Sequence, residues 1–499
     1  MLYFVVKSVK MNKSSECEKR LYMKKVTVLL ILIFAVSVFS ACSKVEKSNI
    51  DYSIGDPLET SNTIQSESPP PDPTVTTSDT SSSSKTDTSK TTTNSNTSNS
   101  TINKPSKTTK SETTTKPGTT TKPGTTTGGT TVTTPPVSSS RYNPINYSIQ
   151  KGVWITYIEN IIVSSGKTEA QYRNIISSAY SKIKATGCNT VYVHVRSHAD
   201  AYYDSSYFAK SYKSSSSFDQ LEVMVDEAHK YGLSIHAWIN PMRGPTASAM
   251  ASMPDTAVMK KWYNDPSKNG KYIVNYGGNY YFNPAYSEVR QLISNGIAEI
   301  VSRYNVDGIH IDDYFYPSGA ASSFDASAYS QYGSGMSLAE WRRSNTDKMV
   351  SSMYSTIKNI NSKIPFGISP QGNNSNNYNS LYANVSKWCS TSGYLDYVVP
   401  QLYWSFNHPT AGFKSKCAEW RGIVKNSNIK LVIGLAPYKV GTNEYDFYTD
   451  PYIMSKEINY SKTISDYGGV AFYRYDHISG GSIPPGVQQD MNNIKQALK

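Results

Sequence analysis

Two adjacent acidic residues, Asp312 and Asp313, follow the short apolar stretch 308–311 and precede the aromatic run 314–316. Hydrolysis of a glycosidic bond usually uses two carboxyl groups, one protonated to release the leaving oxygen and one ionised as base or nucleophile. Adjacent carboxylates do not face each other across a bond, but they fit substrate assistance. In that chemistry the 2-acetamido oxygen of a sugar attacks, while one carboxylate orients the acetamido group and the other acts as acid. Like charges so close raise one pKa and keep a proton available.

The elements around this pair are readable. A helix with one apolar face precedes it, with Val289, Leu292, Ile293, Ile297, Ile300 and Val301 at helical spacing. Asp307 and Gly308 then turn the chain into a strand. Because side chains alternate along a strand, Ile309 and Ile311 share one face, while His310 and Asp312 share the other.

The same alternation of strands and helices repeats along the C-terminal region. Eight segments are predicted as strands: 152–157, 190–196, 234–240, 308–312, 365–370, 397–404, 430–435 and 469–475. Alternating strands and helices imply a parallel sheet, and eight uninterrupted units favour a closed (β/α)8 TIM barrel over an open sheet. The barrel domain is predicted to span residues 146–499.

Polar residues gather at the carboxyl ends of the predicted strands, where TIM barrels carry out chemistry. Asp200 is expected to be a third catalytic carboxylate, with Glu159 and Asp476 as further candidates. The predicted substrate-binding residues are Arg196, His198, Asn240, Arg243, His310, Tyr314, Gln401, Tyr403, Trp404 and Tyr438. Several are aromatic in a chain with 39 tyrosines, and flat rings that carry hydroxyls suit the faces and oxygens of sugars. Trp154 and Trp238, within strands, are expected to be barrel core.

Seven segments together resemble the glycosyl hydrolase-like 10 family: 152–156, 189–196, 229–241, 306–317, 366–370, 397–404 and 436–439. They occur in order over essentially the whole C-terminal domain. The resemblance implies a TIM barrel that acts on glycans at the cell envelope. Relatives in that family include enzymes associated with cutting peptidoglycan strands that lack peptide.

The N-terminal residues 1–42 have the pattern of a bacterial lipoprotein signal. Lys24 and Lys25 precede the apolar run 26–39, and small residues then lead to Cys42. The run is too short for a comfortable membrane span, and the pattern favours Met23 as the start of translation. Phe39 departs from the aliphatic residue usual three positions before the lipidated cysteine, so an uncleaved N-terminal anchor remains an alternative. Either interpretation predicts an extracytoplasmic protein held at a membrane of the bacterial cell envelope.

Residues 43–145 are predicted to be a disordered linker rich in Ser, Thr and Pro, with a six-residue repeat at 116–121 and 122–127. Such a composition does not bury enough apolar surface to fold. A random coil of this length gives roughly 50 Å of reach. The composition suits a tether between membrane and wall.

Charge and cysteine content limit the possible partners and the role of disulfides. Part of the net charge of +12 lies in the predicted signal segment, and the barrel keeps a mild positive excess that is compatible with anionic wall polymers or phospholipid. No basic run with interleaved aromatics indicates nucleic acid. The barrel contains Cys188, Cys389 and Cys417, which form at most one internal bridge, so disulfides do not organise the fold.

The interpretation of this protein as a glycosidase that uses no cofactor and no metal has two alternatives. In the first, a divalent metal serves deacetylation or amide hydrolysis and is held by His194, His198, Asp200, His310, Asp312 and Asp313. In the second, the barrel binds glycan without catalysis, which the lack of an obvious second facing carboxylate favours. The glycosidase reading predicts a polysaccharide substrate rich in N-acetylhexosamine, with peptidoglycan strands first.

Overall fold

The computed structural model describes residues 142–499. The predicted signal segment, Cys42 and most of the predicted linker lie outside the described residues.

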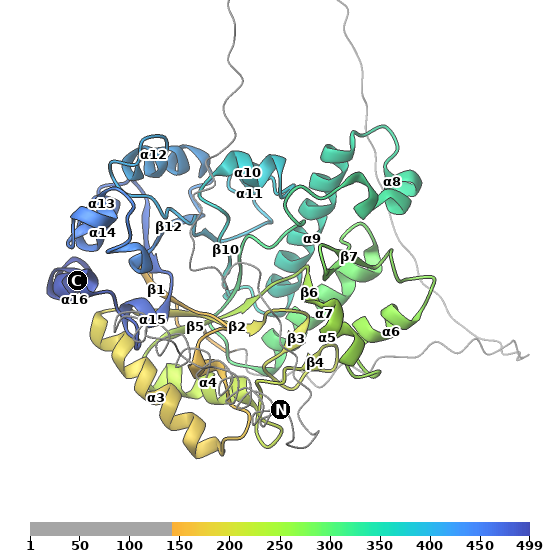
Figure 1. Cartoon of the computed structure of the whole chain (residues 1–499), viewed down its shortest axis with the longest axis horizontal. Helices are drawn as coiled ribbons and strands as arrows, with labels where there is room; N and C mark the ends of the chain where they lie inside the picture. Colours follow the sequence, from red (N-terminus) through yellow and green to blue (C-terminus); the bar gives the residue numbers. More distant parts are fainter. Residues whose placement is uncertain (1–141) are drawn as a thin grey trace, which may run out of the picture. The chain divides into compact units, whose positions relative to one another are not determined.

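The centre of the domain is a closed parallel barrel whose strand order is β1-β2-β5-β9-β10-β11-β12-β13. The strands are β1 (Gln150–Ile155), β2 (Thr190–Arg196), β5 (Ser234–Ile239), β9 (Gly308–Ile311), β10 (Phe366–Ile368), β11 (Tyr397–Val398), β12 (Lys430–Leu435) and β13 (Tyr467–Phe472). Each strand falls on one of the eight predicted segments, and chain order equals barrel order, which confirms the TIM barrel (Figure 1).

Longer helices flank the barrel strands (Figure 1). They are α3 (Glu169–Thr186), α4 (Gln220–Lys230), α7 (Ser287–Arg303), α9 (Leu338–Ile360), α12 (Phe413–Ile423), α14 (Ile453–Ser461) and α16 (Pro485–Ala497). Local sequence sets several of their ends. Thr168 and Ser337 each form a reciprocal capping box at the start of α3 and α9, and Gly187 ends α3 with a φ of 100° that a residue with a Cβ rarely adopts.

Shorter helical segments occupy the loops between these elements. They are η1 (Asn160–Ile162), α5 (Ala247–Ser252), α6 (Val258–Asn264), η2 (Ser322–Phe324), α8 (Ala326–Tyr332), α10 (Asn374–Asn379), α11 (Val385–Trp388), η3 (Pro437–Lys439), α13 (Asp446–Thr449) and α15 (Tyr475–Ile478).

Two small sheets in the loops were not predicted from the sequence. One is the parallel pair β3 (Asp200–Ala201) and β4 (Ala209–Lys210), and the other is an antiparallel sheet of β6 (Arg243–Thr246), β8 (Asn279–Phe282) and β7 (Ile273–Tyr276). Gly277 and Gly278, both at positive φ, form the tight turn between β7 and β8. This glycine pair between two tyrosine-rich stretches is a hairpin signal that the sequence does contain.

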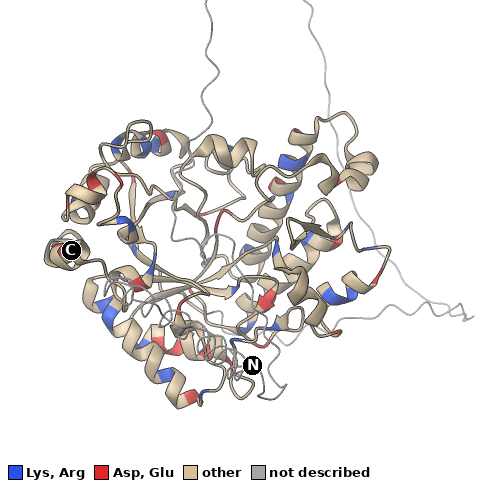
Figure 2. Cartoon of the chain, in the orientation of Figure 1, with Lys and Arg blue, Asp and Glu red and all other residues tan. Residues whose placement is uncertain are grey.

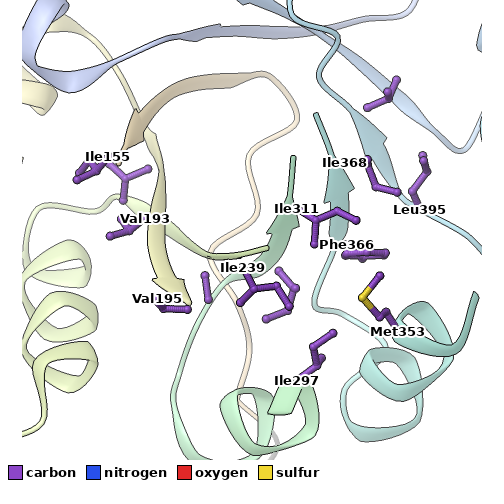
Figure 3. Packing of buried hydrophobic residues seen from close by; sticks show 14 of the residues in the cluster. Ile155, Val193, Val195, Ile239, Ile297, Ile311, Met353, Phe366, Ile368 and Leu395 are labelled. Carbon is purple, nitrogen blue, oxygen red and sulfur yellow. The ribbon is translucent and has the colours of Figure 1, made fainter. Parts of the chain in front are cut away.

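Strand alternation divides the core into two layers. Outward-facing residues such as Ile309 and Ile311 pack against the helices, and Figure 3 shows Ile311 beside Phe366 and Ile368, with Met353 of α9 close by. The inner layer consists of Trp154, Tyr192, Trp238, Tyr397, Val399, Val432 and Ala471. The prediction that Trp154 and Trp238 are barrel core is confirmed.

Glycines make room for the large inner rings. A Cβ added at Gly367 would lie 1.8 Å from the ring of Tyr397, and one at Gly152 would lie 2.4 Å from the ring of Tyr192. Because such distances are far below van der Waals contact, these positions accept no larger residue unless the aromatic rings move. Large rings opposite glycines therefore fill the barrel as a packed core.

The segment that leads into β1 is fixed to the amino-terminal end of β9. The buried carboxylate of Asp307 accepts hydrogen bonds from the Tyr142 hydroxyl (2.6 Å), the Ile145 amide (2.6 Å) and the Ile235 amide (2.9 Å), and it lies 3.0 Å from Nε2 of His229. These contacts join three distant parts of the chain at the end of the barrel opposite Asp312.

Within residues 142–499, no helix is both long and apolar enough to span a bilayer. Cys188, Cys389 and Cys417 are all buried and free, so no bridge joins Cys389 to Cys417. Figure 2 shows basic and acidic residues interspersed on the helices in this view of the described residues. The electrostatics of the site described below therefore depend on its own neighbouring groups.

Candidate active site

Asp312 comes directly after β9, and its side chain points into the barrel as the alternation predicts. It is 4% exposed. Its Oδ2 accepts a hydrogen bond from Nε1 of Trp238 (3.2 Å), and its Oδ1 accepts one from the amide of Tyr314 (3.1 Å). Burial, together with the charge of Asp313, raises the pKa of Asp312 well above its usual range, while Arg243 opposes the shift. The surroundings of Asp312 therefore favour its protonated form.

Asp313 is partly exposed and has a different set of partners. Its Oδ2 accepts a hydrogen bond from Nε2 of Gln371 (3.0 Å), and its Oδ1 accepts one from Nε2 of Gln401 (3.0 Å). The amide of Asn376 donates to Oε1 of Gln371 (2.6 Å), which fixes the orientation of that glutamine. The two side-chain amides thus fix the orientation of the Asp313 carboxyl group. The adjacent pair consists of one buried carboxyl group and one partly exposed carboxyl group held by two amides.

An aromatic and cationic wall adjoins this pair. The guanidinium of Arg243, at the start of β6, lies 4.3 Å from the ring centre of Tyr314 and 5.8 Å from that of Tyr157. His194 of β2 stacks on Trp238 with ring centres 3.3 Å apart. Burial, and next the charge of Arg243, lowers the pKa of His194 well below its usual range, so this imidazole is neutral. Its Nδ1 accepts the amide hydrogen of Tyr157 (3.2 Å), which places the ring proton on Nε2.

Asp200 shapes the loop after β2. Its Oδ1 accepts hydrogen bonds from the amides of Ser197 (3.1 Å) and His198 (2.9 Å) and from the Ser197 hydroxyl (3.3 Å). It also lines a cavity of about 140 Å³ together with His198, Met253 and residues of β4 and α5. The structure therefore gives Asp200 a clear part in the turn that carries His198. It shows no contact between Asp200 and the Asp312–Asp313 pair.

His198 and Asn240 lie close to the wall formed by Tyr157. His198 meets the Tyr157 ring edge-on with ring centres 4.8 Å apart, and burial lowers its pKa well below the usual range. Asn240 is buried and donates from Nδ2 to the carbonyl of Ser197 (3.2 Å). Both residues support the same side of the site that Arg243 lines.

Arg196 and His310, which the sequence predicts as substrate-binding residues, contact groups of the surrounding fold. Arg196 lies 4.2 Å from the ring centre of Phe208, and a Cβ added at Gly296 of α7 would lie 2.6 Å from its Nη1. A register shift between His194 and Arg196 breaks the alternation, which is why Arg196 turns outward toward α7.

His310 points inward, and both of its ring nitrogens form hydrogen bonds with core residues. Its Nε2 accepts from Nε1 of Trp154 (3.0 Å), and its Nδ1 lies 3.1 Å from the Tyr397 hydroxyl. That hydroxyl lies 2.6 Å from Nδ1 of His236, whose Nε2 lies 3.1 Å from the Ser234 hydroxyl. Because the indole only donates, a neutral His310 carries its proton on Nδ1, and each following group in the chain donates to the next. His310 is a buried structural residue.

The opposite wall of the site comes from β11, β12 and β13. Tyr403 and Tyr438 meet edge-on with ring centres 6.1 Å apart, and Tyr473 lies 5.9 Å from Tyr403. Burial raises the pKa of Tyr403 well above its usual range, and the neighbouring tyrosines and both acidic residues add to the effect. Trp404 packs over Gly372, where an added Cβ would lie 2.4 Å from its ring. Of the four predicted residues of this region, Gln401 donates to Asp313, Tyr403 and Tyr438 form the wall, and Trp404 packs on Gly372.

Glu159 and Asp476, the other candidate carboxylates, lie in the loops after β1 and β13 and meet each other there. Glu159 is 1% exposed, and it accepts hydrogen bonds from the amides of Thr156 (2.6 Å) and Asp476 (2.8 Å). Burial raises the pKa of Glu159 to about 7. The contacts join the loop after β1 to α15, which is a structural use of a buried carboxyl group.

Sequence reasoning undervalued three members of the site. Trp238 was expected only as core, yet its indole donates to Asp312. Gln371 was not among the predicted site residues, and it orients Asp313 together with Gln401. His194 was considered only as a metal ligand. Residues 142–499 contain no group of three or more His, Cys, Asp or Glu side chains placed to hold a metal ion.

Comparison with known proteins identifies the family. Residues 150–450 match the sequence family described as Glycosyl hydrolase-like 10. The chain belongs to this family. It is 31% identical over 342 residues to glycosyl hydrolase YngK of Bacillus subtilis, a match that covers 63% of this chain and 66% of that protein. It is also 28% identical over 390 residues to glycosyl hydrolase DigH of Escherichia coli K12, covering 70% of this chain and 88% of that protein.

Solved structures of low sequence identity also align with the chain. The glycoside hydrolase domain of PgaB from Bordetella bronchiseptica is 11% identical, with a TM-score of 0.46, and the alignment covers 69% of this chain and 99% of that domain. The catalytic domain of β-amylase from Paenibacillus polymyxa is 11% identical, also with a TM-score of 0.46, covering 70% of this chain and 99% of that domain. The family membership rests on the sequence matches, and the barrel rests on the strand order described above.

Proposed function

We propose that this protein is a glycosidase that hydrolyses glycosidic bonds in a cell-wall glycan rich in N-acetylhexosamine, with peptidoglycan strands as the first substrate to test. The observation that carries the proposal is the contrast between two adjacent carboxyl groups. Asp312 is buried in surroundings that raise its pKa, whereas Asp313 is partly exposed and accepts two side-chain amide hydrogens. When the surroundings of two carboxyl groups push their pKa values apart, one group can donate a proton while the other acts in its ionised form.

In the proposed reaction, Asp312 donates its proton to the glycosidic oxygen as the bond to the anomeric carbon breaks. The carbonyl oxygen of the substrate's own 2-acetamido group forms the new bond to that carbon. Asp313 accepts a hydrogen bond from the acetamido N–H and stabilises the positive charge that develops there. Water then opens the cyclic intermediate, giving its proton to Asp312 and restoring the acetamido group.

The walls of the site support binding of a sugar. Tyr157 and Tyr314 present rings on one side, and Tyr403 and Tyr438 present rings on the other. Rings of this kind contact the apolar faces of pyranoses, while phenol hydroxyls reach sugar oxygens. Arg243, between Tyr157 and Tyr314, opposes the raised pKa of Asp312 and supplies donors to sugar hydroxyls.

We further propose that the protein acts at the bacterial cell envelope and that a lipid on Cys42 anchors it to the membrane. This proposal is supported by the signal-like pattern that ends in Cys42 and by the Ser/Thr-rich composition that follows it. A tethered domain with reach on the scale of a polymer coil suits a substrate fixed in the wall.

The test is release of reducing ends from purified peptidoglycan strands by the wild type, Asp312→Asn and Asp313→Asn. Circular dichroism checks that each variant is folded, and Asp466→Asn, whose side chain is 65% exposed, serves as a matched control. Both active-site variants should lose activity by roughly 100-fold or more. Full activity in both would place the chemistry elsewhere, and a folded wild type that binds strands without cutting them would favour the non-catalytic glycan-binding alternative.

The substrate is tested by chemical removal of acetyl groups. Strands without N-acetyl groups should be cut far more slowly, because the internal nucleophile is gone. Equal rates on acetylated and deacetylated strands would contradict the assisted mechanism. Activity confined to cellulose, xylan or starch would contradict the substrate as well.

A further inference from the structure

Three aromatic side chains form a row that leads away from the acidic pair, defined by Trp404, His408 and Tyr445. Trp404 and His408 follow β11, whereas Tyr445 follows β12. Ring centres are 6.4 Å apart between Trp404 and His408 and 5.0 Å apart between His408 and Tyr445. Tyr445 is 51% exposed. Half of a large aromatic side chain thus faces solvent at the outer end of the row.

The row is continuous with the site. Gln401, which donates to Asp313, is separated from Trp404 by only two residues. A Cβ added at Gly372 would lie 2.3 Å from the carbonyl oxygen of Gln401 and 2.4 Å from the Trp404 ring, so both residues pack on the same glycine. Two successive ring contacts connect Trp404 to Tyr445, so the row extends the aromatic surface beyond Trp404.

The backbone conformation of Tyr445 is strained. Its φ of 47° and ψ of −127° suit glycine, and a bulky residue adopts them rarely. Neighbouring contacts brace the position. Asp446 accepts hydrogen bonds from the backbone amide (2.7 Å) and the side-chain amide (2.8 Å) of Asn407, and Lys439 pairs with Glu444 (2.7 Å). A strained residue with an exposed ring, held by its surroundings, points to a use for that ring.

His408 is suited to contact sugars as well as rings. Its Nδ1 accepts the amide hydrogen of Ala411 (3.0 Å), so a neutral ring keeps its proton on Nε2 as a donor. Burial, and next the charge of Lys439, lowers its pKa. The row therefore combines apolar aromatic surface with one donor, the combination that binds pyranoses.

We propose that Trp404, His408 and Tyr445 bind sugar units of the glycan chain at a distance from the bond that is cut. The proposal deepens the proposed function, because it assigns the enzyme a preference for long chains over short oligosaccharides. The occupant is the same polysaccharide strand whose bond lies at Asp312. Binding energy from such remote units holds the strand in register at the acidic pair.

The experiment compares Tyr445→Gly, Tyr445→Phe and Tyr448→Ala in an Asp312→Asn background. Glycine removes the ring and also relieves the positive φ, so this variant should fold at least as stably as its parent. Tyr448 is the matched control, since it is 63% exposed and lies in the same segment, but it is not part of the row. Affinity for purified peptidoglycan strands should fall roughly fivefold in Tyr445→Gly and stay near the parent value in the other two.

In an otherwise wild-type chain, Tyr445→Gly should raise the KM for long strands and leave cleavage of a short N-acetylated oligosaccharide unchanged. Equal affinity of the Gly variant and its parent would overturn the proposal, as would an equal loss in Tyr448→Ala. Loss of thermal stability in the Gly variant would instead show a structural role for the ring. Because binding is measured in a background without the acid, failure of the cleavage mechanism leaves this result interpretable.

Discussion

Replacement of Asp312 by asparagine separates proton donation from every other effect of this side chain. Without its proton donor, the site should cleave natural strands about 100- to 10,000-fold more slowly, which corresponds to roughly 3–5.5 kcal/mol of transition-state stabilisation. The structure also predicts a cost in stability. Oδ1 and Oδ2 of Asp312 both accept N–H groups, from Tyr314 and Trp238, so an asparagine NH2 must face one of these donors. One unmade buried hydrogen bond costs about 1–3 kcal/mol, which denaturant unfolding can measure.

The decisive assay varies the leaving group. A synthetic N-acetylated glycoside that releases nitrophenolate needs no proton, so Asp312→Asn should retain most of the wild-type rate on it while losing activity on natural strands. The wild-type rate on natural strands should also fall as pH rises through the raised pKa of Asp312, since the acid form is then lost. The variant should lack this decline on the activated substrate. Equal losses on both substrates would refute the assignment of Asp312 as acid.

Three further predictions concern stability and location. Neither carboxyl oxygen of Glu457 has a hydrogen-bond partner among the described residues, and burial raises the pKa of this group. The folded state therefore keeps a proton on Glu457 that the unfolded state loses above about pH 4.3. Wild-type stability should therefore decrease with rising pH in denaturant titrations, while Glu457→Leu should remove this contribution and add about 1–3 kcal/mol at neutral pH. Asp307→Ala should cost roughly 3 kcal/mol or more, because it leaves the donors of Tyr142 and two backbone amides without their acceptor; an unchanged unfolding midpoint would contradict this. Cys42→Ala should yield unprocessed or released protein in fractionation with labelled fatty acid, and a variant that fractionates like wild type would disprove the lipid anchor.

The barrel was predictable because its strands are short, apolar and evenly separated by helices. Segments 190–196 and 430–435 match β2 and β12 residue for residue. The segment 397–404 was predicted too long, because only Tyr397 and Val398 pair as a strand before the chain turns into the loop with Gln401. Strand pairing ends where polar side chains leave the sheet, and residue type alone does not mark that point.

Alternation along β9 predicted correctly that Asp312 faces inward with His310. It did not predict which side chains His310 and Asp312 would contact. His310 lies one layer deeper, where the indole of Trp154 and the hydroxyl of Tyr397 take both of its nitrogens. Alternation also did not predict the direction of Arg196, since the register shift after His194 reverses the face it occupies. Depth in the barrel and irregular pairing are three-dimensional properties that spacing does not encode.

The end of β9 explains how neighbours in sequence acquire different chemistry. Asp312 is the last side chain to follow the inward alternation, so it lies beside the indole of Trp238, which itself stacks on His194. Only 4% of Asp312 is exposed there, and burial favours its protonated form. Asp313 is the first residue free of the strand, and it turns toward β10 and β11, whose ends carry Gln371 and Gln401. The position at which β9 stops therefore gives the two neighbouring carboxyl groups different surroundings, which is the contrast that the proposed function uses.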